Sequence, residues 1–159
     1  MGIKAQHNFA DILKNHINFI NNVNVSLVES LNRAAQEITN LAKNTDTYTD
    51  RTNNLRSSIG YVLYKDGQKI AASFGKAGTG EEGNGAQGIA KGEGFADTVA
   101  QKYGSGYVVV LVAGMEYAAY VEAKNFDVIT GATMQFDGVL KDNLETIARV
   151  TGINFGKAE

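Results

Sequence analysis

The stretch Tyr107–Glu122, YVVVLVAGMEYAAYVE, joins a continuous apolar run to a mixed aromatic and acidic segment. The apolar part, Val108–Val112, consists only of β-branched and aliphatic residues. Such a run is typical of a strand buried on both faces, so we expect the central strand of a sheet here. Gly114 ends the strand. The tyrosines and glutamates that follow it predict an amphipathic elbow at the edge of the sheet.

The composition limits the classes of protein to which the chain can belong. A length of 159 residues suits a single domain over 1–159, and 43% hydrophobic residues are enough for a core. With 15 basic and 17 acidic residues, the formal net charge is −2, which argues against a protein that grips nucleic acid or a membrane surface. The lack of cysteine excludes disulfides and thiolate metal sites. We therefore expect a protein made in the cytoplasm, without cofactor or metal.

The N-terminal third, residues 8–43, carries apolar residues at the three- and four-residue spacing of a helix, and Asn8 is a fair N-cap. An asparagine-rich stretch and a capping box of Ser26 and Glu29 favour two helices, Asn8–Phe19 and Ser26–Lys43. The alternative is one continuous helix, because the apolar residues keep their phase throughout. That helix would be about 50 Å long, too long for one small domain to cover, and it would need a partner chain.

A hairpin is expected over residues 59–74, after a polar connector at Asn44–Ser58. Apolar and aromatic residues fill Ile59–Tyr64, and Asp66-Gly67 is a strong signal for a two-residue turn. The return strand is expected at Gln68–Phe74.

Glycine dominates the next segment, residues 75–94, where eight of twenty residues are glycine. It contains a formal match to the dinucleotide-binding fingerprint, but further glycines follow and Glu81 and Glu82 would repel phosphate. We expect instead a flexible surface loop that becomes ordered against a partner. The glycines proposed for this contact are Gly78, Gly80, Gly83 and Gly85.

The last part, 95–150, is expected to hold a helix at Phe95–Tyr103, the apolar strand, and an amphipathic helix that begins near Phe136. Thr151-Gly152 is expected to end this helix. A tail at Ile153–Glu159 follows. The fold class is therefore α+β: N-terminal helices, one antiparallel sheet with a hairpin and a central strand, and a C-terminal helix packed on the sheet.

Two motifs resemble a known family. Residues 50–59, Asp-Arg-Thr-Asn-Asn-Leu-Arg-Ser-Ser-Ile, resemble Asp-(Arg)-Thr-Gly-x-Leu-x-x-Ser-Ile, and residues 116–122 are similar to Glu-Tyr-Ala-x-Tyr-Val-Glu. Both patterns belong to the head–tail joining and tail-completion (neck) proteins of lambda-like tailed bacteriophages, and the resemblance covers roughly Leu27 to Val150. Asn53 stands where the family usually has glycine, which is tolerable because asparagine also accepts a left-handed backbone.

The resemblance implies a non-enzymatic virion protein, of a phage or a prophage, that forms a ring at the neck or upper tail. The implied partners are its own copies, as a hexamer or dodecamer, and neighbouring connector, head-completion, tail-tube or terminator proteins. DNA would be only the genome passing through the lumen, and no membrane is involved. The interface candidates are Arg51, Leu55, Arg56, Tyr117, Tyr120 and Glu122, since tyrosine and arginine are common anchors of interfaces.

Other functional classes remain open from the residues alone. An enzyme would use Glu116 and Glu122 as paired acids, which requires burial or proximity to separate their pKa values. A nucleic-acid-binding or small-molecule-binding module of bacterial origin is the other alternative. The lysines that would contact nucleic acid are scattered and are not interleaved with aromatic residues.

Overall fold

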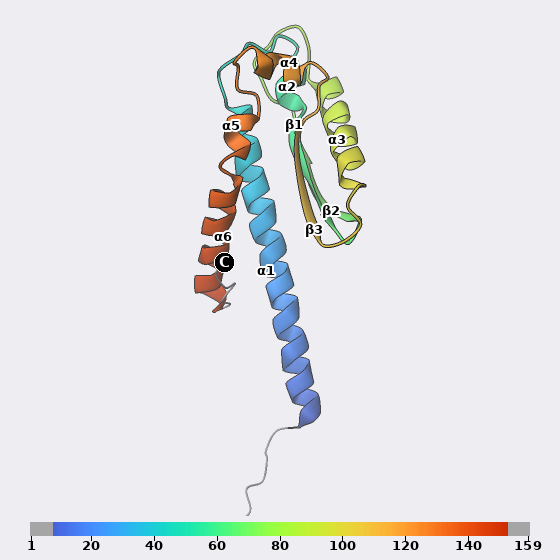
Figure 1. Cartoon of the computed structure of the whole chain (residues 1–159), viewed down its shortest axis with the longest axis vertical. Coiled ribbons are helices and arrows are strands. Elements are labelled where there is room, and N and C mark those ends of the chain that lie inside the picture. Colours follow the sequence, from blue (N-terminus) through green and yellow to red (C-terminus); the bar gives the residue numbers. More distant parts are fainter. Residues whose placement is uncertain (1–7, 153–159) are drawn as a thin grey trace, which may run out of the picture.

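A computed structural model describes residues 8–152 of the chain. The expected C-terminal tail, Ile153–Glu159, lies outside these residues. The fold is α+β, with one long N-terminal helix, a three-stranded antiparallel sheet and a C-terminal helix. Figure 1 shows the sheet and the helix α3 (Ala86–Ala100) on one side of the long helix and the C-terminal helix on its other side. None of the helices within residues 8–152 combines the length and apolar character needed to span a membrane.

The long helix α1 runs without a break from Phe9 to Lys43, and Asn8 Oδ1 accepts a hydrogen bond from the Ala10 N–H at its start. The preferred prediction of two helices is therefore wrong, and the alternative of a single helix is confirmed. Ser26 does not cap a second helix, because its carbonyl accepts the Ser30 hydroxyl inside the continuous helix. Extending an existing helix needs no new nucleus, so an asparagine-rich stretch does not suffice to interrupt it.

The sheet consists of β1 (Ile59–Lys65), β2 (Gln68–Phe74) and β3 (Tyr107–Ala113) in the order β2-β1-β3. The hairpin prediction is confirmed, and its turn has positive φ at both Asp66 and Gly67, as a type I′ turn requires. The prediction that β3 is the central strand is wrong, because β1 lies between the other two strands. Both faces of β3 nevertheless pack on a core cluster, through Val110 and Val112 on one side and the half-buried Leu111 and Ala113 on the other, which suits its continuous apolar sequence.

The core has one layer on each face of the sheet. On one face, α3 packs against Val62, Val110 and Val112. On the other face, Ile59 joins Ile38 of α1 in a second cluster. The short helices α2 (Asn54–Ser57), α4 (Ala118–Ala123) and α5 (Thr130–Thr133) lie at the end of the sheet where α1 ends (Figure 1).

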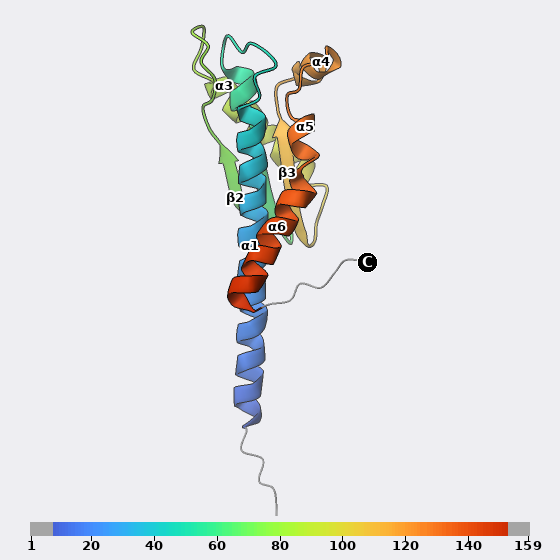
Figure 2. The same cartoon turned by 90° about the vertical axis from the view of Figure 1, so that its left-hand side faces the viewer.

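The C-terminal helix α6, Phe136–Thr151, packs mainly along α1 rather than on the sheet (Figure 2). The predicted packing of this helix on the sheet is limited to its start, where Phe136 and Val139 reach the cluster around Ile59. Its predicted end is confirmed, because Gly152 caps it with φ +70°.

The glycine-rich segment is half helical. The helix α3 runs from Ala86 to Ala100, so the flexible loop expected over 75–94 is wrong for 86–94, and the helix begins well before the expected Phe95. Three glycines explain the error. Gly88 and Gly92 are buried on the inner face of α3, where a Cβ would overlap the backbone of Asn54 and of Ser58 respectively, and Gly114 lies against Gly92. Glycine here permits close packing of backbones rather than flexibility.

Candidate functional site

The two motifs that carry the family resemblance lie side by side at one end of the sheet. Directly before the second motif, the Gly114 N–H donates to the Ser58 carbonyl at 3.2 Å and the Met115 N–H donates to the Ser58 hydroxyl at 3.3 Å. Within the motifs, Tyr117 is hydrogen-bonded to Thr52. Burial raises the pKa of the Tyr117 hydroxyl, and the negative charge of Asp50 adds to this increase. Residues that are almost sixty positions apart in the sequence thus form one continuous unit.

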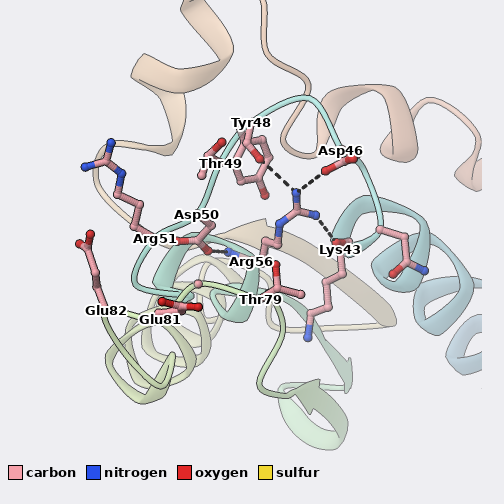
Figure 3. A pocket seen from close by; sticks show the side chains of 13 residues that line it. Lys43, Asp46, Tyr48, Thr49, Asp50, Arg51, Arg56, Thr79, Glu81 and Glu82 are labelled. Carbon is pink, nitrogen blue, oxygen red and sulfur yellow. Dashed lines mark hydrogen bonds and ion pairs between the residues drawn. The ribbon is translucent and has the colours of Figure 1, made fainter.

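Arg56 holds together the connector that follows α1 by hydrogen bonds to its backbone (Figure 3). Its guanidinium donates to the carbonyl of Lys43 at 2.6 Å, of Thr45 at 2.5 Å and of Tyr48 at 3.1 Å. The side chain is only 12% exposed, and it lies 4.7 Å from the centre of the Tyr48 ring. Arg56 therefore satisfies the Lys43 carbonyl at the end of α1 and two carbonyl groups of the connector, those of Thr45 and Tyr48.

Tyr48 is enclosed by this arrangement. Burial raises the pKa of Tyr48 to about 12, although the positive charge of Arg56 opposes the increase. Within residues 8–152, its hydroxyl is buried without a hydrogen-bond partner. The Tyr48 ring therefore acts as an apolar surface for the guanidinium, and it stays neutral at physiological pH.

Asn53 connects the first motif to the glycine-rich loop. It has φ +62°, so the expectation that asparagine accepts the left-handed backbone at this position is confirmed. Its side-chain amide donates to the carbonyls of Gly80 and Gly83 at 2.7 and 2.8 Å, and its oxygen accepts the Gly80 N–H at 2.7 Å.

Residues 75–85 therefore have fixed contacts within the chain, contrary to the expectation that a partner is needed to order them. Gly78 and Gly85, two of the four glycines proposed for a partner contact, have φ values of +102° and +73°. The left-handed backbone at these positions favours glycine on local grounds, without a partner.

An open cleft of about 660 Å³ lies between the end of α1, the connector and this loop. Its lining carries both signs of charge, from Lys43, Arg51, Arg56, Asp46, Asp50, Glu81 and Glu82 (Figure 3). Two of the cations already have partners inside the chain: Arg56 as described, and Lys43, whose Nζ donates to the Gly75 carbonyl at 3.0 Å. Burial lowers the pKa of Lys43. The cleft thus consists largely of groups that hold the local fold together.

Glu122 organises the turn between α4 and α5. Its carboxylate accepts the N–H groups of Val128, Ile129 and Thr130, and also the Thr130 hydroxyl at 2.6 Å. Partial burial alone would raise the pKa of Glu122, but the hydrogen bond from the Thr130 hydroxyl and those from the backbone outweigh it and lower the pKa. Glu122 therefore acts as an ionised cap for the start of α5.

This environment predicts a pH dependence. Because the folded-state pKa of Glu122 lies below its ordinary value of 4.5, its contribution to stability is present above that value and is lost as the pH falls through the folded-state pKa. We expect Glu122→Gln to lower the free energy of unfolding by on the order of 1 kcal/mol at pH 7 and by clearly less near pH 3. Urea unfolding at both pH values measures this.

The control for this measurement is Glu82→Gln, which removes one exposed carboxylate elsewhere. A difference between Glu122→Gln and the unmodified chain that stayed constant from pH 7 to pH 3 would contradict the assignment of Glu122 as an ionised cap.

Glu116 and Glu122 have separate environments. Glu116 is exposed and pairs with Lys91 of α3, and this hydrogen-bonded pair lowers the pKa of Glu116. Glu122 faces residues 128–130 instead. Both shifts favour the ionised form, whereas an acid and base pair requires pKa values that are pushed apart. The geometry therefore gives no support to the hypothesis of paired catalytic acids.

The six interface candidates divide into two groups. Leu55 is 2% exposed and belongs to the core, and the side chains of Arg56 and Glu122 are engaged within the chain, as described above. Arg51 is exposed, as are Tyr117 at 40% and Tyr120 at 64%. In Figure 3 the Arg51 side chain points away from Arg56. The surface that remains available to a partner is therefore formed by Arg51, Tyr117 and Tyr120.

One exposed surface was not among the candidates. The first half of α1 carries Phe9, Ile12, Leu13, Ile17, Phe19 and Ile20, which are between 46 and 73% exposed. The sequence does contain a signal for this surface, because the apolar residues over 8–43 keep a constant helical phase. The prediction of two separate helices does not take this phase into account.

In a comparison with known proteins, no protein-family model, no curated protein and no solved structure matches this chain.

Proposed function

We propose that this chain is a structural virion protein of a tailed phage or prophage, and not an enzyme, that forms a ring at the head–tail neck or upper tail and joins or completes the tail. The observation that carries the proposal is that the two motifs pack against each other: Tyr117 of the second is hydrogen-bonded to Thr52 of the first, and Ala118 shares a core cluster with Leu55. Two sequence patterns of one family that meet in one structural unit support a common origin better than two separate matches do.

An exposed aromatic surface beside the second motif supports a binding role. Tyr120 and Phe126 are 64% and 45% exposed, and they line a groove of about 560 Å³ together with residues of the 46–49 connector. Lys124 lies 5.3 Å from the centre of the Tyr120 ring. Tyrosine beside a cation is common in protein interfaces. In the proposed ring this surface contacts a neighbouring copy or an adjacent connector, head-completion or tail protein.

Tyr120→Ala is expected to weaken this contact and to leave the monomer folded. The Tyr120 side chain is largely exposed, so its removal is expected to change the free energy of unfolding by less than about 0.5 kcal/mol. In the interface the same truncation is expected to cost about 2 kcal/mol, a roughly thirtyfold weaker association. Light scattering after size exclusion, over a concentration series, measures the association. Tyr103→Ala, which removes an exposed ring (54%) far from the motifs, is the control. Equal association of both variants would remove Tyr120 from the interface.

The proposed function itself is tested in particles. Phage particles are induced from a bacterium that carries the gene, purified, and examined by quantitative mass spectrometry. The proposal expects this chain in the virion at six or twelve copies, and inactivation of the gene is expected to yield separate heads and tails. Complete, infectious particles that lack the chain would rule the proposal out.

A further inference from the structure

The first half of α1 extends beyond the rest of the described chain (Figures 1 and 2). The hydrogen bonds with the remaining elements end near Asn24, whose side chain accepts the Tyr107 hydroxyl at 3.2 Å. An open pocket beside Thr151 of α6 is lined by Ser26 and, farther along the helix, by Asn22 and Phe19. All residues from Asn8 to Asn22 are exposed. Residues 9–20, about three turns of helix, are therefore largely exposed within residues 8–152.

This free segment, residues 9–20, continues the buried face of α1. Farther along the helix the buried apolar residues are Leu31, Ala34, Ala35, Ile38 and Ala42. Counting back from Leu31 by helical turns leads to Ile20, Ile17 and Leu13, which lie on the same face. The same apolar stripe is thus buried in one half of the helix and exposed in the other.

The exposed stripe is broad. From Phe19 to Ile17, the apolar residues of the free segment cover an arc of about 160° at 100° per residue, and His16 lies within this arc. A two-stranded coiled coil needs only a narrow seam of a and d positions, whereas a wider stripe suits a helix that contacts two neighbours. The breadth of the stripe therefore favours a bundle of more than two helices.

The polar face of the same segment indicates which kind of partner binds the exposed apolar stripe. It carries asparagines and only two charges, Asp11 and Lys14, which cancel each other. A helix that lies on a membrane surface usually has several Lys and Arg residues on its polar face, which this one lacks. Helices without net charge do not repel one another, so identical copies can lie side by side.

We propose that the free segment of α1 binds the same segment of further copies of this chain, in a parallel helical bundle. Its six large apolar side chains expose on the order of 600 Å² per copy, which approaches the ~800 Å² per partner of a stable interface. All helices point the same way in a closed cyclic ring. This inference goes beyond the proposed function. The association of the segments rests on α1 alone and not on either motif, whereas their parallel orientation rests on the ring of the proposed function.

The first test replaces Leu13, Ile17 and Ile20 together by glutamine, in the full chain. Glutamine is a good helix former, and all three positions are exposed in the monomer. The circular dichroism spectrum and the unfolding midpoint are therefore expected to stay unchanged at concentrations at which the unmodified chain is monomeric. The dissociation constant of the oligomer, from light scattering over a concentration series, is expected to rise at least about a hundredfold. The control is Met134→Gln with Val150→Gln, which removes strongly exposed apolar side chains elsewhere.

Two outcomes of this test would overturn the inference. One is an unmodified chain that stays monomeric at all concentrations, and the other is an oligomer that the triple variant leaves intact. Neither outcome decides the proposed function, which the particle experiment tests separately.

The second test uses the absence of cysteine from the chain, so that any introduced thiol is unique. Oxidation is expected to cross-link Ile17→Cys between copies several-fold faster than Asn18→Cys, which lies on the polar face one residue away. Leu13→Cys and Ile20→Cys alone are each expected to cross-link, because parallel helices bring like positions together. Equal rates at positions 17 and 18 would contradict a specific bundle. Cross-linking only in a mixture of the variants at 13 and 20 would contradict the parallel orientation.

Discussion

Gly92→Ala is expected to destabilise the protein by about 2–3 kcal/mol. Gly92 lies in α3 against the start of β1, where a Cβ would overlap the Ser58 carbonyl oxygen and would lie 2.9 Å from a ring carbon of Phe74. Gly114 approaches the same point from the end of β3. Neither backbone can move without disturbing the hydrogen bond between Ser58 and Gly114. The cost of this overlap exceeds the roughly 1 kcal/mol by which alanine favours a helix over glycine.

The matched control is Gly94→Ala, two residues farther along the same helix. A Cβ on Gly94 would meet nothing within 4 Å, so this variant is expected to be more stable than the unmodified chain by about 0.5–1 kcal/mol. Urea denaturation of the three proteins, monitored by circular dichroism at 222 nm, measures both effects. If the two variants shifted the midpoint in the same direction, the close packing of α3 against Ser58 and Gly114 would be wrong.

Arg56→Met is expected to lower the free energy of unfolding by about 3 kcal/mol. Methionine retains much of the apolar stem of arginine, but it leaves three carbonyl groups in the connector without the charged donor that satisfies them. Arg56→Lys is expected to recover only a small part of the loss, since one ammonium group cannot reproduce the planar fork that reaches Lys43, Thr45 and Tyr48. The ion pair with the fully exposed Asp46 contributes little.

Arg51→Met provides the comparison, because Arg51 is the exposed arginine of the same motif. Its free energy of unfolding is expected to stay within about 0.5 kcal/mol of that of the unmodified chain. The pair also separates folding from assembly: an assembly defect in Arg51→Met would report on an interface, whereas one in Arg56→Met would follow from loss of the connector. Thermal unfolding of Arg56→Met at the temperature of the unmodified chain would refute the role assigned to Arg56.

The elements that the sequence predicts correctly depend on local signals. The hairpin over 59–74 follows from Asp66-Gly67, whose positive φ values are accessible to glycine and tolerated by aspartate. The start of α1 follows from the side-chain cap of Asn8, and the end of α6 follows from Gly152. Each of these signals acts over a few residues, and distant contacts do not alter it.

The errors arise where the same residue type serves two purposes. Glycine permits a flexible loop, but in α3 it permits contact between two backbones, and only the positions of Ser58 and Gly114 distinguish these uses. A continuous apolar strand fits either the centre of a sheet or an edge with both faces covered. The strand β3 is the second case, because pairing places β1 in the middle. Asparagines weaken an isolated helix, but tertiary packing of residues 26–42 stabilises α1 beyond this effect.

For the candidate site, the sequence by itself determined the α+β class, the hairpin, the helical ends and the two motifs, because periodicity and turn chemistry are local. Only the tertiary structure decided which candidate residues are available. It buries Leu55, engages Arg56 and Glu122 within the chain, and leaves Tyr117 and Tyr120 exposed. It also leaves one half of the amphipathic helix α1 without cover. Exposure depends on what lies opposite a residue in space, and that is set by long-range packing, which no short stretch of sequence contains.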